Sequence, residues 1–102
     1  MQFLILFRVV TGTPMDQVFA LVKEESARNW EFYAAGLFRQ SFYFDDYSGA
    51  VILAEANTQD EVEMATQSFP MVKAGLLTVE VIPLRPYIGI AQLFANPVSL
   101  SA

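Results

Sequence analysis

The order of the apolar segments constrains the fold of this chain more than any other feature. Four short runs, rich in aromatic and β-branched residues, are typical of strands, and two longer segments of good helix formers separate them. The expected strands are residues 2–9, 37–44, 50–56 and 76–82, and the expected helices are residues 14–34 and 59–69. The order β-α-β-β-α-β predicts a ferredoxin-like α+β fold, in which a four-stranded antiparallel sheet carries both helices on one face.

Residues that favour helix ends and turns support these segments. Thr13 is a candidate N-cap before a proline at the first helical position, and Gly36 is expected to end that helix. Residues 45–49, with the sequence DDYSG, are expected to form the turn of a hairpin between the two middle strands. Thr58 is the expected N-cap of the second helix, and Pro70 is expected to stop it.

The strands are apolar on both sides. In the first one, Phe3, Ile5 and Phe7 alternate with Leu4 and Leu6, whereas a sheet face in contact with water would alternate with polar residues. The chain is also 54% hydrophobic over only 102 residues, which is more apolar surface than a small domain buries alone. We therefore expect a homodimer whose sheets pack face to face, or a higher homo-oligomer built from such dimers.

The composition excludes several classes of function. Because the chain has no cysteine and no histidine, it cannot use a disulfide, a thiol nucleophile, a histidine-containing triad or an imidazole-bound metal, and we expect no metal or cofactor. A net charge of −5 without a basic cluster argues against a nucleic-acid partner. The N-terminal run lacks the basic flank and cleavage site of a signal peptide, and no stretch is apolar enough to span a membrane. We expect a soluble, cytoplasmic protein.

A carboxylate stands in the apolar face of the first expected helix. On a wheel of about 100° per residue, Val18, Val22 and Tyr33 define the middle of the apolar arc, and Glu25 and Asn29 fall within that arc. A carboxylate at such a position must be paired, protonated or exposed to a wet cavity, because burying it alone is costly. Without a nearby cation the pKa of Glu25 would rise, and a raised pKa suits a proton-transfer base.

Arg39 is the candidate partner of this carboxylate. By simple alternation it shares one strand face with Leu37, Ser41 and Tyr43. A guanidinium in a mostly apolar sheet binds a carboxylate through two hydrogen bonds, either that of Glu25 or that of a ligand. The alternative is a purely structural pair between Glu25 and Arg39 in a small core.

Three segments resemble the muconolactone isomerase family. Residues 24–44, EESARNWEFYAAGLFRQSFYF, resemble its helix-Gly-x-x-Arg-strand segment, and residues 55–71 and 76–87 resemble its Asp-x-Pro-Ser-x-Glu helix, Leu-Pro break and Ile-Glu-Val strand. The matching positions are Glu25, Gly36, Arg39, Pro70 and Val79-Glu80-Val81. The family's histidine after the strand arginine is Gln40 here, so the resemblance leaves the substrate open.

The resemblance implies a dimeric α/β barrel that moves a proton on an unsaturated lactone without a cofactor. It implies that Glu25 is the proton shuttle and that Arg39 binds a carboxylate or stabilises an enolate. It also implies that residues 88–102 leave the domain of residues 1–87 and form an arm over the neighbouring subunit, with Arg85 and Tyr87 near a pocket mouth.

The leading hypothesis is thus a cofactor-independent isomerase or lyase that acts on a small, anionic, unsaturated or cyclic carbonyl compound. The residues expected to bind this small-molecule substrate are Asn29, Trp30, Tyr33, Tyr43, Arg85 and Tyr87. A cofactor-free monooxygenase of the same fold would instead use Asn29, Trp30 and Tyr33 on an electron-rich phenol. A non-catalytic ligand-binding or assembly module is the third alternative.

Overall fold

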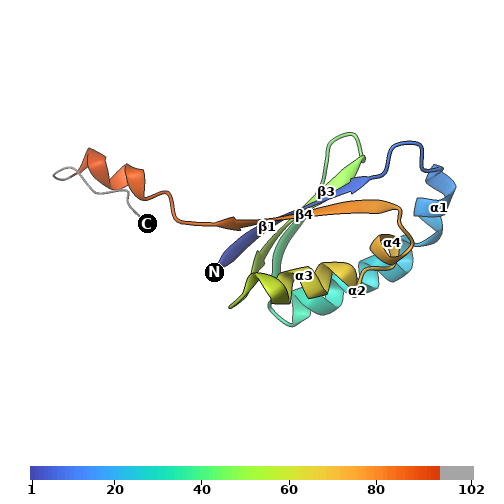
Figure 1. Cartoon of the computed structure of the whole chain (residues 1–102), viewed down its shortest axis with the longest axis horizontal. Helices are drawn as coiled ribbons and strands as arrows, with labels where there is room; N and C mark the ends of the chain where they lie inside the picture. Colours follow the sequence, from blue (N-terminus) through green and yellow to red (C-terminus); the bar gives the residue numbers. More distant parts are fainter. Residues whose placement is uncertain (95–102) are drawn as a thin grey trace.

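The computed structural model describes residues 1–94, and its strands form one antiparallel sheet with the α-helices on one face (Figure 1). The elements are β1 (Gln2–Val9), α1 (Met15–Ala20), α2 (Val22–Ala34), β2 (Phe38–Tyr43), β3 (Gly49–Glu55), α3 (Gln59–Gln67), α4 (Pro70–Lys73), β4 (Leu77–Leu84) and the 3₁₀ helix η1 (Ile88–Leu93). The strands lie in the order β2-β3-β1-β4. The predicted α+β fold with the order β-α-β-β-α-β is confirmed.

The central strand β1 sets the two faces of the sheet. It pairs antiparallel with β3 and β4, so that Ile5 lies opposite Ile52 on one side and Val81 on the other. Because side chains alternate along a strand, Phe3, Ile5 and Phe7 point toward the helices and are buried. Leu4 and Leu6 lie on the opposite face, where the described residues provide no covering layer (Figure 1).

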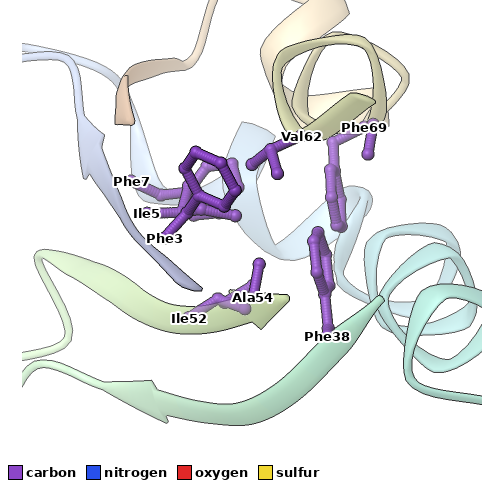
Figure 2. Packing of buried hydrophobic residues seen from close by; sticks show 9 residues of the cluster. Phe3, Ile5, Phe7, Phe38, Ile52, Ala54, Val62 and Phe69 are labelled. Carbon is purple, nitrogen blue, oxygen red and sulfur yellow. The ribbon is translucent and has the colours of Figure 1, made fainter. Parts of the chain in front are cut away.

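The core lies between the sheet and helix α3 with the residues that follow it (Figure 2). The rings of Phe38 on β2 and Phe69 after α3 stack with centroids 6.0 Å apart, and the ring of Phe7 meets Phe69 edge-on at 5.4 Å. Val62 on α3 is completely buried in the same cluster. These contacts are dense apolar packing of the kind that dominates folding stability.

The first predicted helix is divided into two. Leu21, with φ −107° and ψ 1°, ends α1 and precedes α2, so residues 14–34 are not one continuous helix. Thr13 is not the N-cap either, because Pro14 takes that position in an extended conformation and no side chain caps the helix. The expected end at Gly36 is confirmed: Gly36 has φ +84°, and the amide of Leu37 donates to the carbonyl of Phe32 in a Schellman arrangement.

The predicted N-cap of the second helix is found, whereas two prolines differ from the prediction. The cap at Thr58 is confirmed, because its hydroxyl accepts the amide of Glu61 at 3.3 Å. Pro70, however, begins the short helix α4, where its missing amide proton is not needed. Strand β4 also continues through Pro83 to Leu84, beyond its predicted end. A proline is tolerated there because β4 is an edge strand with one side free of ladder hydrogen bonds.

Beyond β4 the chain extends away from the rest of the molecule (Figure 1). The radius of gyration is 16.6 Å, whereas a compact chain of this length would have about 13 Å. Helix η1 has no buried residue, and Tyr87 before it is 84% exposed. Residues 88–93 of the predicted arm form η1, and its residues 95–102 lie outside the described part of the chain. That this arm packs on a neighbouring subunit stays a prediction.

Candidate active site

A cavity of about 640 Å³ lies between the helix-facing side of the sheet and the helices α1 and α2. Apolar side chains from α1, β1, β3 and the β2–β3 hairpin form most of its wall, together with Phe69 and Met71. The polar residues of the wall, apart from two tyrosines, are Glu25, Ser26, Asn29 and Ser41. A mostly apolar cavity of this size with a few convergent polar groups is typical of a small-molecule site.

The cavity exists because the residues that face each other across it are short or polar. Helix α2 has no fully buried residue, and it places Glu25 and Asn29, one turn apart, toward the cavity. Ser41 and Ala50 stand on the opposing strands. Gly49 is required next to them, because a Cβ there would come within 2.0 Å of the backbone oxygen of Phe7. These short and polar residues therefore leave a space between α2 and the sheet, whereas buried apolar side chains fill the space between α3 and the sheet.

Glu25 is half-buried, and its position is fixed by a backbone group. Its Oε1 accepts the amide of Met71, in the first turn of α4, at 3.0 Å. Burial raises the pKa of Glu25 above its ordinary value, and the hydrogen bond from Met71 opposes this rise without cancelling it. Among the described residues no lysine or arginine forms an ion pair with Glu25. The predicted direction of the pKa shift is confirmed.

Asn29 lies beside Ser41, which the sequence did not mark as a binding residue. Nδ2 of Asn29 is 3.3 Å from Oγ of Ser41, and the same hydroxyl is 3.4 Å from Oδ1. These distances are at the long end of the hydrogen-bonding range, so the contact is weak. The pair offers amide and hydroxyl donors on the wall of the cavity, facing the same space as Glu25.

The hairpin between β2 and β3 adds two tyrosines to the wall. Tyr43, which the sequence predicts as a binding residue, lines the cavity, and its ring centroid is 5.6 Å from that of Tyr47. Tyr47 has φ 58°, a left-handed conformation that is uncommon for an aromatic residue. The turn is held by the amide of Ser48, which donates to Oδ1 of Asp46 at 2.9 Å. The hydrogen bond from the Ser48 side chain, and then that from its amide, lower the pKa of Asp46. The sequence does not predict this position of Tyr47, because a left-handed conformation is normally taken by glycine or asparagine.

The expected pairing of Arg39 with Glu25 is wrong. A register shift between Phe38 and Gln40 interrupts the alternation of β2, so Arg39 does not share a face with Ser41 and Tyr43. Instead, Nη2 of Arg39 lies 3.5 Å from Oε2 of Glu55, and both side chains are about half exposed. Arg39 does not line the cavity that contains Glu25.

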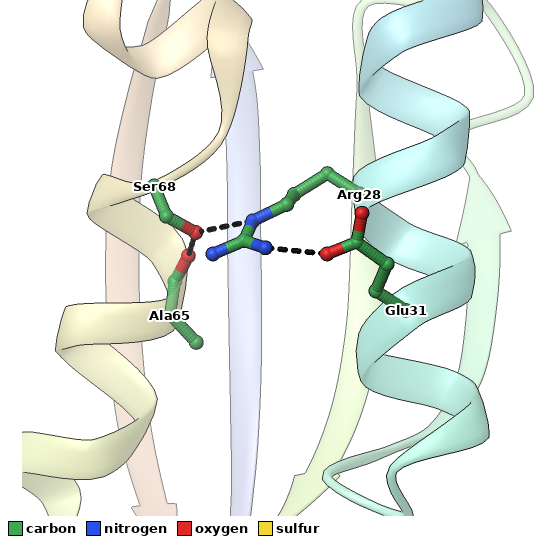
Figure 3. Close-up of polar contacts among 4 residues, drawn as sticks. All are labelled: Arg28, Glu31, Ala65 and Ser68. Atoms are coloured by element: carbon green, nitrogen blue, oxygen red, sulfur yellow. Dashed lines mark hydrogen bonds and ion pairs between the residues drawn. The ribbon is translucent and has the colours of Figure 1, made fainter.

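Two predicted aromatic residues also lie outside the cavity. Trp30 and Tyr33 stack on each other with centroids 5.4 Å apart, and they are 65% and 53% exposed. Arg28 takes the inward position between α2 and α3 instead (Figure 3). Its Nε donates to Ser68 at 3.0 Å, it pairs with Glu31, and its guanidinium carbon lies 4.6 Å from the centroid of the Phe32 ring. An arginine fills an inward position in this way because its long stem is apolar.

Arg85 and Tyr87 belong to the segment that extends away after β4, and neither lines the cavity of its own chain. Residues 1–94 contain no group of three or more side chains suited to holding a metal ion. Within the same residues, no helix has the length and apolar character required to cross a membrane.

Comparisons with known proteins support the fold. A scan against protein-family models found no match, and neither did a search of curated proteins. Among solved structures, the chain is similar to the 5-chloro-2-hydroxyhydroquinone dehydrochlorinase TftG from Burkholderia phenoliruptrix AC1100, in its complex with 2,5-dihydroxybenzoquinone. The TM-score is 0.71 and the sequence identity 22%, over 83% of this chain and 94% of that chain. At this identity the similarity establishes a common fold.

Proposed function

We propose that the protein is a cofactor-independent isomerase or lyase that moves a proton on a small unsaturated cyclic carbonyl compound or lactone. The observation that carries this proposal is the state of Glu25. Its carboxylate is half-buried in an apolar cavity, its pKa is raised by burial, and one of its oxygens is fixed by the amide of Met71. A positioned carboxylate with a raised pKa is a stronger base than one in water, which is what general base catalysis requires.

The proposed reaction begins with removal of a proton. The carboxylate of Glu25 takes a proton from a carbon next to the substrate carbonyl, and the C–H electron pair forms an enolate. If the protonated Glu25 returns the proton to another carbon, the double bond moves and the reaction is an isomerisation. If the enolate expels a leaving group from a neighbouring carbon, the reaction is an elimination. The name of the similar dehydrochlorinase describes a reaction of this second kind, the removal of hydrogen and chloride.

The decisive experiment compares two glutamine substitutions at adjacent positions. α-Angelica lactone, an uncharged unsaturated lactone, serves as the probe, and its isomerisation and deuterium exchange are followed by NMR in deuterated buffer. We expect Glu25→Gln to lower the catalysed rate by roughly 10²-fold or more, the usual effect of removing a general base. Glu24→Gln, at an exposed position, is the control and should retain the rate.

The fold of Glu25→Gln should be preserved, because the amide oxygen of glutamine can still accept the hydrogen bond from Met71. A folded Glu25→Gln protein with the wild-type rate would remove Glu25 from the mechanism. The cofactor-free monooxygenase alternative is less well supported, since Trp30 and Tyr33 do not line the cavity. Oxygen consumption with a phenol, at a rate above that of the lactone reaction, would favour it instead.

We also propose that two copies bury the open faces of their sheets against each other. Leu4 lies opposite Leu53 on one side and Ile82 on the other, so these side chains form an apolar stripe on that face. Light scattering should therefore give at least twice the chain mass of 11.4 kDa. Leu53→Lys should shift the protein toward the monomer, whereas Gln67→Lys on the exposed side of α3 should not. A wild-type monomer at micromolar concentration would contradict this assembly.

A further inference from the structure

The wall of the cavity contains one carboxylate and no lysine or arginine. The chain has six of these cationic residues in total, all within residues 1–94, and none of them lines the cavity. Three of them form ion pairs elsewhere. Nη1 of Arg8 lies 3.4 Å from Oε1 of Glu80, and Nη2 of Arg39 lies 3.5 Å from Oε2 of Glu55. Arg28 pairs with Glu31. Within residues 1–94, Glu25 is therefore the only formally charged side chain in the cavity wall.

An anionic substrate would be poorly accommodated in such a cavity. It would lose the hydration of its own carboxylate on entering an apolar wall, and no lysine or arginine of residues 1–94 lines the cavity of its own chain to compensate for this loss. It would also be repelled by the carboxylate of Glu25, because charges interact more strongly away from bulk water. The anionic compound expected from the sequence, which was to be held by Arg39, does not fit this arrangement. An uncharged ring, by contrast, gains from contact with the apolar wall and the tyrosines.

The polar groups of the cavity suggest how such a ring would be oriented. The amide of Asn29 has two N–H donors and the hydroxyl of Ser41 has one, and their weak mutual contact leaves donor capacity for a ligand. Asn29 follows Glu25 by one helical turn, which places their Cβ atoms roughly 5–6 Å apart. That separation allows an oxygen on the ring to meet Asn29 and Ser41 while a hydrogen on a nearby carbon meets Glu25.

We infer that the cavity selects an uncharged ring compound carrying a hydroxyl or carbonyl oxygen, and that Asn29 and Ser41 bind this oxygen. The inference deepens the proposed function and rests on it, since the bound oxygen is the one on which negative charge develops when Glu25 removes the proton. Ser41 is then a specificity-determining residue as well as Asn29. Hydrogen-bond donors aimed at such an oxygen stabilise an enolate as it forms.

The test measures binding rather than turnover, so that its result is independent of the proposed reaction. The probes are 2-naphthol, its carboxylated analogue 6-hydroxy-2-naphthoate, and naphthalene, each titrated near neutral pH. We expect 2-naphthol to bind about 10-fold or more tightly than the carboxylate, a difference equivalent to about 1.4 kcal/mol. We also expect 2-naphthol to bind more tightly than naphthalene, because only the naphthol has an oxygen for Asn29 and Ser41.

Two matched serine substitutions test the oxygen-binding pair. Ser41→Ala should weaken the binding of 2-naphthol by about 5-fold, the usual effect of one lost hydrogen bond, and should leave naphthalene unaffected. Ser68→Ala, outside the cavity wall, should leave both affinities unchanged. Equal effects of the two substitutions would overturn the role of Ser41. Binding of the naphthoate as tight as that of 2-naphthol, or no binding of 2-naphthol, would overturn the selection for an uncharged ring.

Loss of the lactone reaction is distinguishable from failure of this inference. If the probes bind as expected but Glu25→Gln keeps the wild-type rate, the proposed proton transfer fails and the recognition of an uncharged ring stands. If the lactone reaction depends on Glu25 but the naphthoate binds best, the reaction stands and the inferred substrate class is wrong.

Discussion

Helices α2 and α3 occupy corresponding positions in the two halves of the fold, yet they pack in opposite ways. Helix α3 buries Val62, Ala65 and Thr66 almost completely against the sheet. Helix α2 buries none of its residues fully, and about 640 Å³ of space remains beneath it. The comparison shows two uses of one architecture: helix α3 supplies packing that stabilises the fold, and helix α2 packs less closely and leaves a cavity.

The difference follows from the side chains that each helix turns inward. In the α3 half, Val62 and Phe69 belong to one buried cluster with the aromatic residues of the sheet, and Phe69 also forms part of the cavity wall. In the α2 half, Glu25 and Asn29 meet Ser41 across the cavity. Polar groups at inward positions weaken the packing, and such a cost is expected where a protein builds a functional site.

The largest expected effect concerns the filled half. Phe69→Ala should lower the free energy of unfolding by about 3–5 kcal/mol, because it removes a ring that contacts Phe7, Phe32 and Phe38. Phe19→Ala is the matched control on α1, where the ring is 68% exposed, and it should cost less than about 1 kcal/mol. Chemical denaturation measures both, and similar costs would break the comparison between a filled and an open half.

A smaller effect is expected at the helix ends. Thr58→Ala should cost about 1 kcal/mol of stability, because its hydroxyl caps α3 through the amide of Glu61. Thr13→Ala should cost less than about 0.5 kcal/mol, since α1 has no side-chain cap. Equal losses in thermal unfolding would show that the two helices are anchored alike, contrary to the structure.

The smallest expected effect is the pH dependence that Glu25 gives to stability. Because burial raises its pKa in the folded state, the folded protein holds this proton more tightly than the unfolded chain does. The stabilising contribution is therefore present below the ordinary pKa of glutamate and is lost as the pH rises through the folded-state value. Relative to wild type, Glu25→Gln should gain stability as the pH is raised across this acidic range.

Denaturation of wild type and Glu25→Gln at several pH values measures this difference, with Glu24→Gln as the matched control. A difference that moves in the opposite direction would show that the hydrogen bond from Met71 outweighs the effect of burial.

The features predicted correctly from the sequence depend on local patterns. The order of strands and helices follows from apolar periodicity and from turn residues, and the signals at Gly36 and Thr58 are properties of single helix ends. The inward position of Glu25 and Asn29 follows from the spacing of residues along α2, because both fall on the same arc as Val22, which also lines the cavity.

The errors arise where tertiary contacts override those patterns. The register shift in β2 changes the face on which Arg39 lies, and no residue type in that strand predicts this shift. The aromatic character of Trp30 and Tyr33 predicts binding positions inside the cavity, but both rings are exposed, and Arg28 takes an inward position by donating to Ser68. The amide of Met71 has no sequence signal at all, since every residue other than proline carries one.

The hydrogen bond between Met71 and Glu25 joins residues that are 46 positions apart in the chain. It follows that the candidate base acquires its environment only after the segment beyond α3 has docked onto α2. A fragment that ended before Pro70 would contain every polar residue of the cavity, but its glutamate would lack the amide that fixes the carboxylate. Any local opening of α4 in the intact protein would release the same carboxylate for as long as it lasted, so the orientation of the candidate base depends on the completeness of the fold.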